Sequence, residues 1–308
     1  MKGIELAREF YEEYGKPMIE RDFSQYADRI AVGLVGRGSE CFGFDDDVST
    51  DHDFAPGFCI WITEEDEREF GFKLFRSYST LPKEYKGFKL KDKSNCDFSG
   101  RGVMTIREFF TNYTGKSEGP ETLSDWLYTP SHYLAEATNG EVFCDKLGEF
   151  TRIREKIKNG MPEDVRMKKI ASAVFLMAQS GQYNYSRCLH HGENGAARLA
   201  LSEFVKNSIE VSFLLNKKHM PYYKWSFKAM KELEIFGDRA SVLEKMLDTP
   251  NCKSSNIINE IEAFCAAVVS EMRLQNLTDI DDDYLEHHAY RVNENIVDHR
   301  LRNSSIII

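Results

Sequence analysis

Two short polar segments near the N-terminus carry the residue types that hold phosphate and a divalent cation. The first is the turn 36–40 (GRGSE), and the second is the Asp-His-Asp segment 51–53. Glycines let the backbone turn sharply and approach a ligand closely, so that Ser39 and neighbouring amides can bind phosphate oxygens. In a strand, Asp51 and Asp53 would point to the same face, because side chains alternate along the backbone. Paired carboxylates suit Mg²⁺, which prefers hard oxygen ligands and shares them with substrate phosphates, so the pattern predicts chemistry on phosphates.

The elements expected to position these segments are strands and a preceding helix. The apolar runs 30–35 and 58–62 predict buried strands on either side of the two segments, and 102–106 predicts a third strand. Residues 3–28 have apolar side chains close to helical spacing, which predicts a helix packed on the sheet. Thr63 followed by three acidic residues is typical of a helix N-terminus. The first part of the chain therefore predicts a small mixed sheet with helices.

The second half of the chain shows helical periodicity. Helical patterns dominate from Leu123 onward, at about 122–137, 145–158, 163–180, 194–217, 221–235, 238–247 and 254–275. Strand patterns in the first part and helical patterns in the rest indicate an α+β fold. At 308 residues the chain is long enough for two domains, and the polar segment 111–120 is a plausible connector. The prediction is an N-terminal domain at 1–120 and an all-helical domain at 121–308.

Composition narrows the classes of partner. The net charge of −10 argues against tight, sequence-independent binding of nucleic acid, which needs a basic surface, and no sequence-specific nucleic acid partner is expected either. No apolar run approaches the length of a membrane span, and the charged N-terminal segment lacks the apolar core of a signal peptide. The seven cysteines are scattered and form no C-x-x-C pair, as expected of reduced thiols. These features predict a cytoplasmic protein with no membrane partner.

The pattern Gly38-Ser39 followed by Asp51-x-Asp53 resembles the signature of the DNA polymerase β-type nucleotidyltransferase superfamily. That superfamily includes the aminoglycoside and lincosamide nucleotidyltransferases. The match is closer to a related bacterial branch with no known substrate, whose phrase GSE…GFDD…S.DHDF is found here at residues 38–54. Segments 181–187 and 214–225 also look like that branch, so the resemblance extends over most of the chain.

The resemblance implies a nucleotidyltransferase domain followed by a helical substrate-binding domain. It implies Mg²⁺-dependent transfer of a nucleoside monophosphate from a triphosphate, such as ATP, to a hydroxyl acceptor, either a small molecule or a protein. Asp51 and Asp53 would hold the metal ion, and Gly38 and Ser39 would bind the β- and γ-phosphates. Ser49, in the acidic loop between them, would cap the turn or contact a phosphate.

A third carboxylate is the missing part of this pattern. Polymerase-type enzymes usually need one as metal ligand or general base, and it is expected on the third strand. Residues 102–106 contain no acid, and the nearest carboxylates are Asp97 and Glu108. Some relatives take the base from the helical domain, which makes Glu193 the candidate; the alternative is a surface or helix-capping glutamate.

Two cations in the helical half are candidates for charge neutralisation. Arg187 follows an unusually polar helical segment and could clamp triphosphate oxygens or the acceptor, although a surface arginine at a helix end is the other interpretation. Lys224 lies among three aromatic residues in segment 221–225. It could face a phosphate while the aromatic rings line a pocket, or it could snorkel from a packed core.

Three functions remain open on the sequence alone. The first is the nucleotidyltransferase described above. The second is a catalytically degenerate module that binds or senses nucleotides, which the acid-free third strand suggests. The third is an antitoxin-like partner of a helical nuclease. It ranks last because no clear Arg-x(4–6)-His motif lies in a suitable place.

Overall fold

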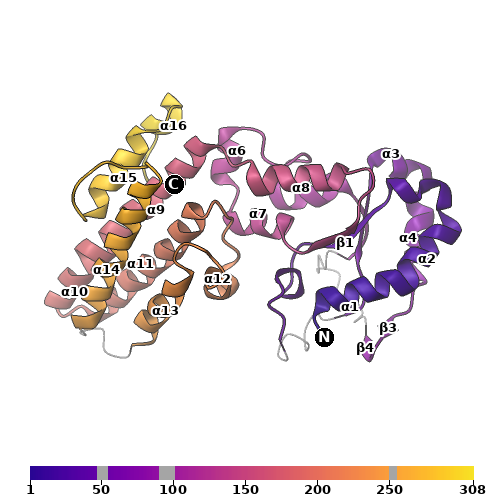
Figure 1. The fold of residues 1–308 in the computed structure, drawn as a ribbon, viewed down its shortest axis with the longest axis horizontal. Coiled ribbons are helices and arrows are strands. Elements are labelled where there is room, and N and C mark those ends of the chain that lie inside the picture. The colour runs from indigo at the N-terminus through magenta and orange to yellow at the C-terminus, as the bar shows by residue number, and fades with distance from the viewer. Residues whose placement is uncertain (47–54, 90–100, 250–254) are drawn as a thin grey trace. The chain divides into compact units, whose positions relative to one another are not determined.

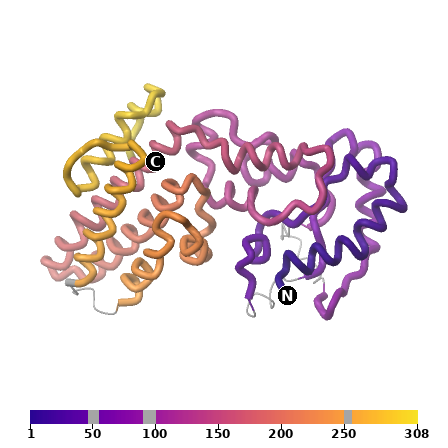
Figure 2. The backbone as a smooth tube through the Cα atoms, in the orientation of Figure 1, coloured from indigo at the N-terminus to yellow at the C-terminus, as the bar shows by residue number. Residues whose placement is uncertain are grey.

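The computed structural model describes residues 1–46, 55–89, 101–249 and 255–308 (Figure 1). The chain divides into two compact units, an N-terminal unit at 1–160 and a C-terminal unit at 161–308. The division lies forty residues beyond the predicted domain boundary at 120. It differs because the chain after residue 120 returns to the sheet of the first unit, a path that can be followed in the backbone trace of Figure 2.

A four-stranded mixed sheet forms the centre of the N-terminal unit. Its strands are β1 (Ala31–Leu34), β2 (Cys59–Ile62), β5 (Gly102–Thr105) and β6 (Glu141–Cys144), in the order β5-β2-β1-β6. Strand β1 runs antiparallel to both β2 and β6, and β2 runs parallel to β5. The three predicted strands are confirmed to within one residue at either end. Strand β6 was missed, because its four residues include no long apolar run and are only partly buried.

Alternation along β2 distributes its side chains between two cores. Phe58 and Ile60 join a cluster with helices α1 (Gly3–Phe10) and α2 (Lys16–Asp22), which are linked by a π-helical turn. Trp61 faces the other way and stacks on Phe150, with ring centroids 3.8 Å apart. Because both faces of the strand are covered, β2 is a continuous apolar run.

The remaining elements of the N-terminal unit complete these two layers. The segment after β2 begins at Thr63, whose side chain accepts a hydrogen bond from the Asp66 amide, as the sequence predicts. The other helices are α3 (Glu64–Asp66), α4 (Phe72–Ser79), α5 (Ile106–Thr114), α6 (Leu123–Tyr128), α7 (Ser131–Thr138) and α8 (Glu149–Asn159), with a small hairpin of β3 (Glu84–Tyr85) and β4 (Phe88–Lys89).

The described residues of the C-terminal unit form helices and no strands, so the α+β prediction is confirmed. Helix α9 (Glu163–Met177) continues through a π-helical segment into α10 (Ser186–His190), and it packs along α11 (Asn194–Leu215) and α15 (Leu285–Glu294). The other helices are α12 (Tyr223–Met230), α13 (Ala240–Asp248), α14 (Ser255–Leu274) and α16 (His299–Asn303).

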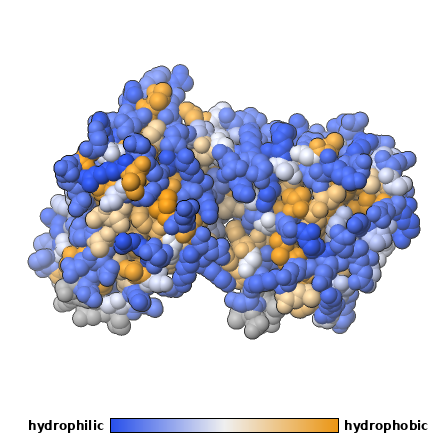
Figure 3. Space-filling model, in the orientation of Figure 1, coloured by the Kyte–Doolittle hydropathy of each residue, from blue (hydrophilic) through white to orange (hydrophobic). Residues whose placement is uncertain are grey.

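Most large apolar side chains of the described residues are buried in the cores of the two units. On the face shown in Figure 3, hydrophilic side chains predominate and apolar ones are scattered in small groups. Among the residues that the structure describes, no helix combines the length and the apolarity needed to cross a bilayer.

Candidate phosphate-binding site

The sheet topology brings the Gly-Ser turn and the starts of two strands to one edge. Gly33 near the end of β1 pairs with Cys59 at the start of β2, because the two strands are antiparallel. Cys59 in turn pairs with Gly102 at the start of β5, because those strands are parallel. The turn after β1 therefore lies at the same edge as residues 55–58 and Arg101, which precede the other two strands.

The turn has a backbone that only glycine adopts easily. Gly36 and Gly38 have φ values of +124° and +120°. A Cβ added at Gly36 would lie 2.6 Å from the Tyr113 hydroxyl oxygen, and one at Gly38 would lie 2.5 Å from the Glu40 carboxylate. The conformation of the turn therefore requires both glycines, and an added Cβ would meet the protein's own side chains.

Ser39 follows at the start of a short 3₁₀ turn. Its carbonyl oxygen accepts hydrogen bonds from the amides of Phe42 and Phe44, at 3.2 and 2.9 Å. Ser39 is partly exposed as a residue, and its hydroxyl group makes no hydrogen bond with the described residues. The backbone of the turn is therefore held while the Ser39 hydroxyl stays available to a ligand.

Asn139 fastens the turn from the far end of α7. Its side-chain amide donates to the Gly36 carbonyl oxygen at 2.7 Å, and its Oδ1 accepts from the Gly36 amide at 2.8 Å. The next residue, Gly140, donates its amide to the Cys41 carbonyl at 2.8 Å. Arg154 donates to the Asn139 carbonyl at 3.1 Å. The segment between α7 and β6 thus holds the backbone of the turn in place by hydrogen bonds, a role that the sequence did not predict.

Replacing Asn139 with alanine is expected to destabilise the protein by about 1–3 kcal/mol, because two half-buried backbone groups of Gly36 lose their partner. The measurement is the free energy of unfolding in denaturant. Asn159→Ala is the matched control, since Asn159 bonds only an exposed carboxylate and should change stability by less than about 0.5 kcal/mol. Equal effects of the two substitutions would show that Asn139 does not hold the turn.

A buried ion pair supports the turn from the start of β5. Arg101 donates from Nη2 to Glu40 Oε1 at 3.0 Å, and each side chain is only 8% exposed. Burial also raises the pKa of the neighbouring Cys41 thiol well above its usual value. Glu40 belongs to the motif itself, but nothing in the sequence pairs it with a residue sixty-one positions away.

The chain that enters β2 is fixed at the same edge. The hydroxyl group of Tyr78 donates to the Phe58 carbonyl at 2.8 Å and accepts from the Phe58 amide at 3.2 Å. Burial raises the pKa of Tyr78 to about 12, so it stays neutral. A Cβ at Gly57 would lie 3.1 Å from Arg101 Cδ and 3.2 Å from the Tyr78 hydroxyl. Backbone and side chains therefore pack closely just after the Asp-His-Asp segment.

The predicted metal ligands Asp51 and Asp53, and the predicted phosphate contact Ser49, lie outside the described residues. Within the described ranges, no three His, Cys, Asp or Glu side chains gather as a metal-binding group. The donor chemistry of the two aspartates fits Mg²⁺, which prefers hard oxygen ligands and shares them with substrate phosphates.

The predicted third strand is β5, and it contains no acidic residue. The nearest acidic residue downstream of it lies at the end of the strand away from the Gly-Ser turn. Glu108 is exposed in the first turn of α5, after Thr105, which pairs with Ile62 at the opposite edge of the sheet. Asp97 lies outside the described residues. Glu40 and Glu136 are carboxylates beside the turn; Glu40 lies in the sequence motif, and neither was assigned a role from the sequence.

The three predicted residues of the C-terminal unit are all exposed. The Arg187 guanidinium lies 4.8 Å from the ring centroid of Tyr183, and Lys224 Nζ lies 4.9 Å from that of Trp225. Glu193 occupies the N-cap position of α11 without a side-chain capping bond. In the described part of the chain, no hydrogen bond or ion pair joins any two of Arg187, Glu193 and Lys224.

Of the residues near Arg187 and Lys224, Gln182 is held by hydrogen bonds to other helices, whereas Tyr223 lies on the surface. Gln182, in the polar segment before Arg187, donates to Glu262 Oε2 at 2.8 Å and accepts from the Leu285 amide at 2.9 Å, so it ties helices together. Near Lys224, Tyr223 is 70% exposed. The core-packing interpretation of this aromatic segment is therefore wrong for Tyr223, which remains on the surface.

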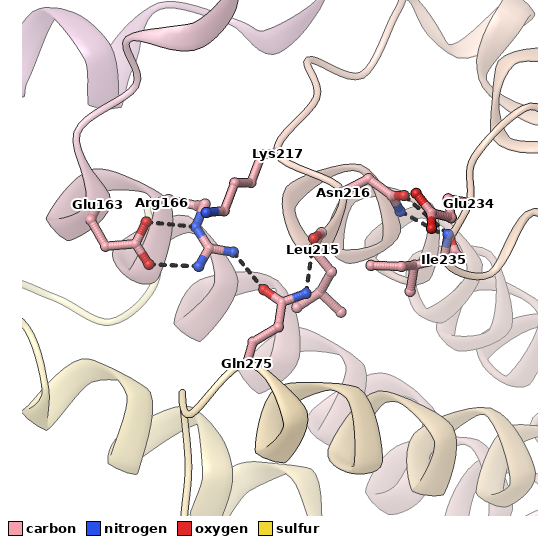
Figure 4. Close-up of a pocket in the computed structure, with 8 residues that line it drawn as sticks. All are labelled: Glu163, Arg166, Leu215, Asn216, Lys217, Glu234, Ile235 and Gln275. Carbon is pink, nitrogen blue, oxygen red and sulfur yellow. Dashed lines mark hydrogen bonds and ion pairs between the residues drawn. The ribbon is translucent and has the colours of Figure 1, made fainter.

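A cavity of about 370 Å³ in the C-terminal unit contains none of the predicted site residues (Figure 4). Arg166, which is 5% exposed, donates to both Glu163 oxygens, to Gln275 Oε1 and to the Leu214 carbonyl. Asn216 exchanges two hydrogen bonds with the Ile235 backbone. These contacts cap the end of α11, so the segment 214–216 is structural.

The chain is similar to one protein family over part of its length and to a solved structure. The family described as "Domain of unknown function (DUF4037)" matches residues 126–226, from within α6 to within α12. No curated protein matches the chain. Among solved structures, it is similar to a nucleotidyltransferase-like protein from Exiguobacterium sibiricum 255-15, with a TM-score of 0.38 and 10% identity over 95% of this chain and 85% of that one. The relationship to aminoglycoside and lincosamide enzymes stays a prediction.

Proposed function

We propose that the protein is a Mg²⁺-dependent nucleotidyltransferase that moves a nucleoside monophosphate from a triphosphate to a hydroxyl acceptor. The observation that carries the proposal is the turn 36–39 at the edge of the sheet. Gly36 and Gly38 have positive φ values, Asn139 holds the Gly36 backbone by two hydrogen bonds, and Ser39 follows with its hydroxyl group. Backbone amides and a hydroxyl in such a turn are suited to phosphate oxygens. The Asp-x-Asp pair that the resemblance assigns to Mg²⁺ precedes β2, which starts at this same edge.

Each predicted residue has a role in this proposal. Gly38 and Ser39 would bind the β- and γ-phosphates, with Ser49 as a further contact. Asp51 and Asp53 would hold Mg²⁺, which supplies charge neutralisation at the phosphates when bound. Arg187, Lys224 and Glu193 are exposed on the C-terminal unit. The roles predicted from the sequence would be charge neutralisation for the two cations and general base for the glutamate.

Catalysis would then depend mainly on positioning and electrostatics, as in phosphoryl transfer generally. The acceptor is a small molecule or a protein side chain, and the cytoplasm is the proposed compartment. A degenerate nucleotide-binding module is the second candidate. It is favoured by one observation, the absence of an acid from β5, which leaves the expected third carboxylate position empty of charge.

Thermal stability with ATP, GTP, CTP and UTP, each with and without Mg²⁺, tests the proposal. A ligand at a hundred times its dissociation constant should stabilise the folded protein by about 2.7 kcal/mol, and the melting temperature should rise only when Mg²⁺ is present. Release of pyrophosphate in the presence of acceptor candidates would separate an enzyme from a binding module. A protein whose melting temperature responds to none of the four nucleotides would contradict both.

A further inference from the structure

Arg37 is the cationic side chain of the glycine turn. It stands between Gly36 and Gly38, and its guanidinium Nε lies 3.5 Å from Oε2 of Glu136 on α7. The Arg37 side chain is 52% exposed, whereas that of Glu136 is 12% exposed. The turn thus presents a half-exposed cation whose present partner is a largely buried carboxylate.

The contact between the two groups is loose. A separation of 3.5 Å exceeds the 2.7–3.2 Å of an ordinary N–H···O hydrogen bond, and it involves Nε rather than a two-pronged contact. Half-exposed ion pairs of this kind contribute little to stability. Phosphate oxygens offer the guanidinium a bidentate, fully charged partner, which Arg prefers.

The other groups around the pair do not replace Glu136 as a partner for Arg37. Burial first, and then the negative charge of Glu136, raises the pKa of Tyr113, so that this hydroxyl remains neutral beside Gly36. Burial first, and then the positive charge of Arg37, lowers the pKa of His132, one turn before Glu136 on α7. The carboxylate is therefore the group that competes with a ligand for Arg37.

We propose that Glu136 holds Arg37 in the ligand-free turn and that Arg37 transfers to the triphosphate when a nucleotide binds. This inference rests on the proposed function, and it adds Arg37 as a phosphate-binding residue and Glu136 as its competitor. The exchange sets a threshold for binding. An anion of low charge gains too little from Arg37 to displace a buried carboxylate, whereas a triphosphate displaces it.

The test is a double-mutant cycle on nucleotide affinity, measured by calorimetry with the triphosphate that stabilises the wild type most. Glu136→Gln should tighten binding about two- to fivefold, because the carboxylate charge that competes with the ligand for half-exposed Arg37 is removed. Arg37→Met should weaken binding about tenfold or more, because a charge-assisted contact is lost. In the Arg37→Met background, Glu136→Gln should change the affinity by less than about twofold.

Glu141→Gln is the matched control. Glu141 lies on β6 of the same unit and pairs with Arg8 instead of Arg37, so its loss removes the same charge without freeing the turn. The melting temperatures of the ligand-free variants show whether each variant is folded. Glu136→Ala removes the same carboxylate as Glu136→Gln and should tighten binding in the same way.

The outcomes separate the inference from the function on which it rests. If the wild type binds and Glu136→Gln leaves the affinity unchanged, or if Glu141→Gln tightens binding equally, the exchange is disproved. The same holds if the gain persists fully without Arg37, because long-range repulsion would then explain it. A wild type that binds none of the four nucleotides removes the proposed function and the inference together.

Discussion

Replacing Asp51 or Asp53 with asparagine is expected to abolish Mg²⁺-dependent nucleotidyl transfer. Loss of an outer-shell partner typically costs about 10- to 100-fold in metal affinity or activity, and loss of a direct carboxylate ligand should cost at least about a hundredfold. The isosteric amide keeps the volume of the side chain but withdraws the charge that Mg²⁺ requires. The measurement is pyrophosphate release at saturating Mg²⁺, together with the Mg²⁺-dependent rise in melting temperature.

Asp46→Asn is the matched control for this substitution. Asp46 belongs to the same acidic stretch and is exposed, and it was not assigned as a metal ligand. The control variant should therefore retain turnover and the Mg²⁺-dependent shift. Full turnover in either Asp51→Asn or Asp53→Asn would remove the metal assignment, whatever the control shows.

Replacing Arg101 with methionine should destabilise the protein by about 3–5 kcal/mol. Arg101 and Glu40 are each 8% exposed, and removing the cation breaks a buried ion pair by taking away one of its two charges. The free energy of unfolding in denaturant measures the loss. Combining Arg101→Met with Glu40→Gln should restore part of the stability, because the buried negative charge is then removed together with the positive one.

Arg107→Met provides the comparison for Arg101→Met. Arg107 pairs with Glu64 at 3.6 Å, but about half of each side chain is exposed, so the loss should not exceed about 1 kcal/mol. If the two arginine substitutions cost the same, the Glu40–Arg101 pair is no stronger than a surface contact. A large loss from Arg101→Met alone would show that the ion pair holds the Gly-Ser turn to the start of β5.

Local sequence patterns determined the parts of the fold that depend on neighbouring residues. The apolar runs at 30–35 and 58–62 predicted β1 and β2, because a strand covered on both faces needs an unbroken apolar stretch. The paired glycines at 36 and 38 predicted the turn, because residues other than glycine adopt its positive φ values only with strain. Thr63 predicted a helix start for the same kind of local reason, since its side chain caps an amide three residues ahead.

Contacts between distant residues were decided by the tertiary structure. Asn139 bonds a glycine 103 positions earlier, and Arg101 pairs with Glu40 across sixty-one positions, so no periodicity could reveal either contact. Strand β6 is short and half-buried, and it is held in the sheet by pairing with β1. Because this strand belongs to the sheet, the N-terminal unit ends at 160 and not at the predicted boundary of 120.

The sequence by itself therefore determined the α+β class, the glycine turn and the hypothesis of a phosphate and metal site, because these follow from residue type and local spacing. Only the tertiary structure decided which side chains hold that turn and which carboxylate faces Arg37. The physical reason is that backbone preferences act over a few residues, whereas ion pairs and hydrogen bonds form between whichever groups packing brings together.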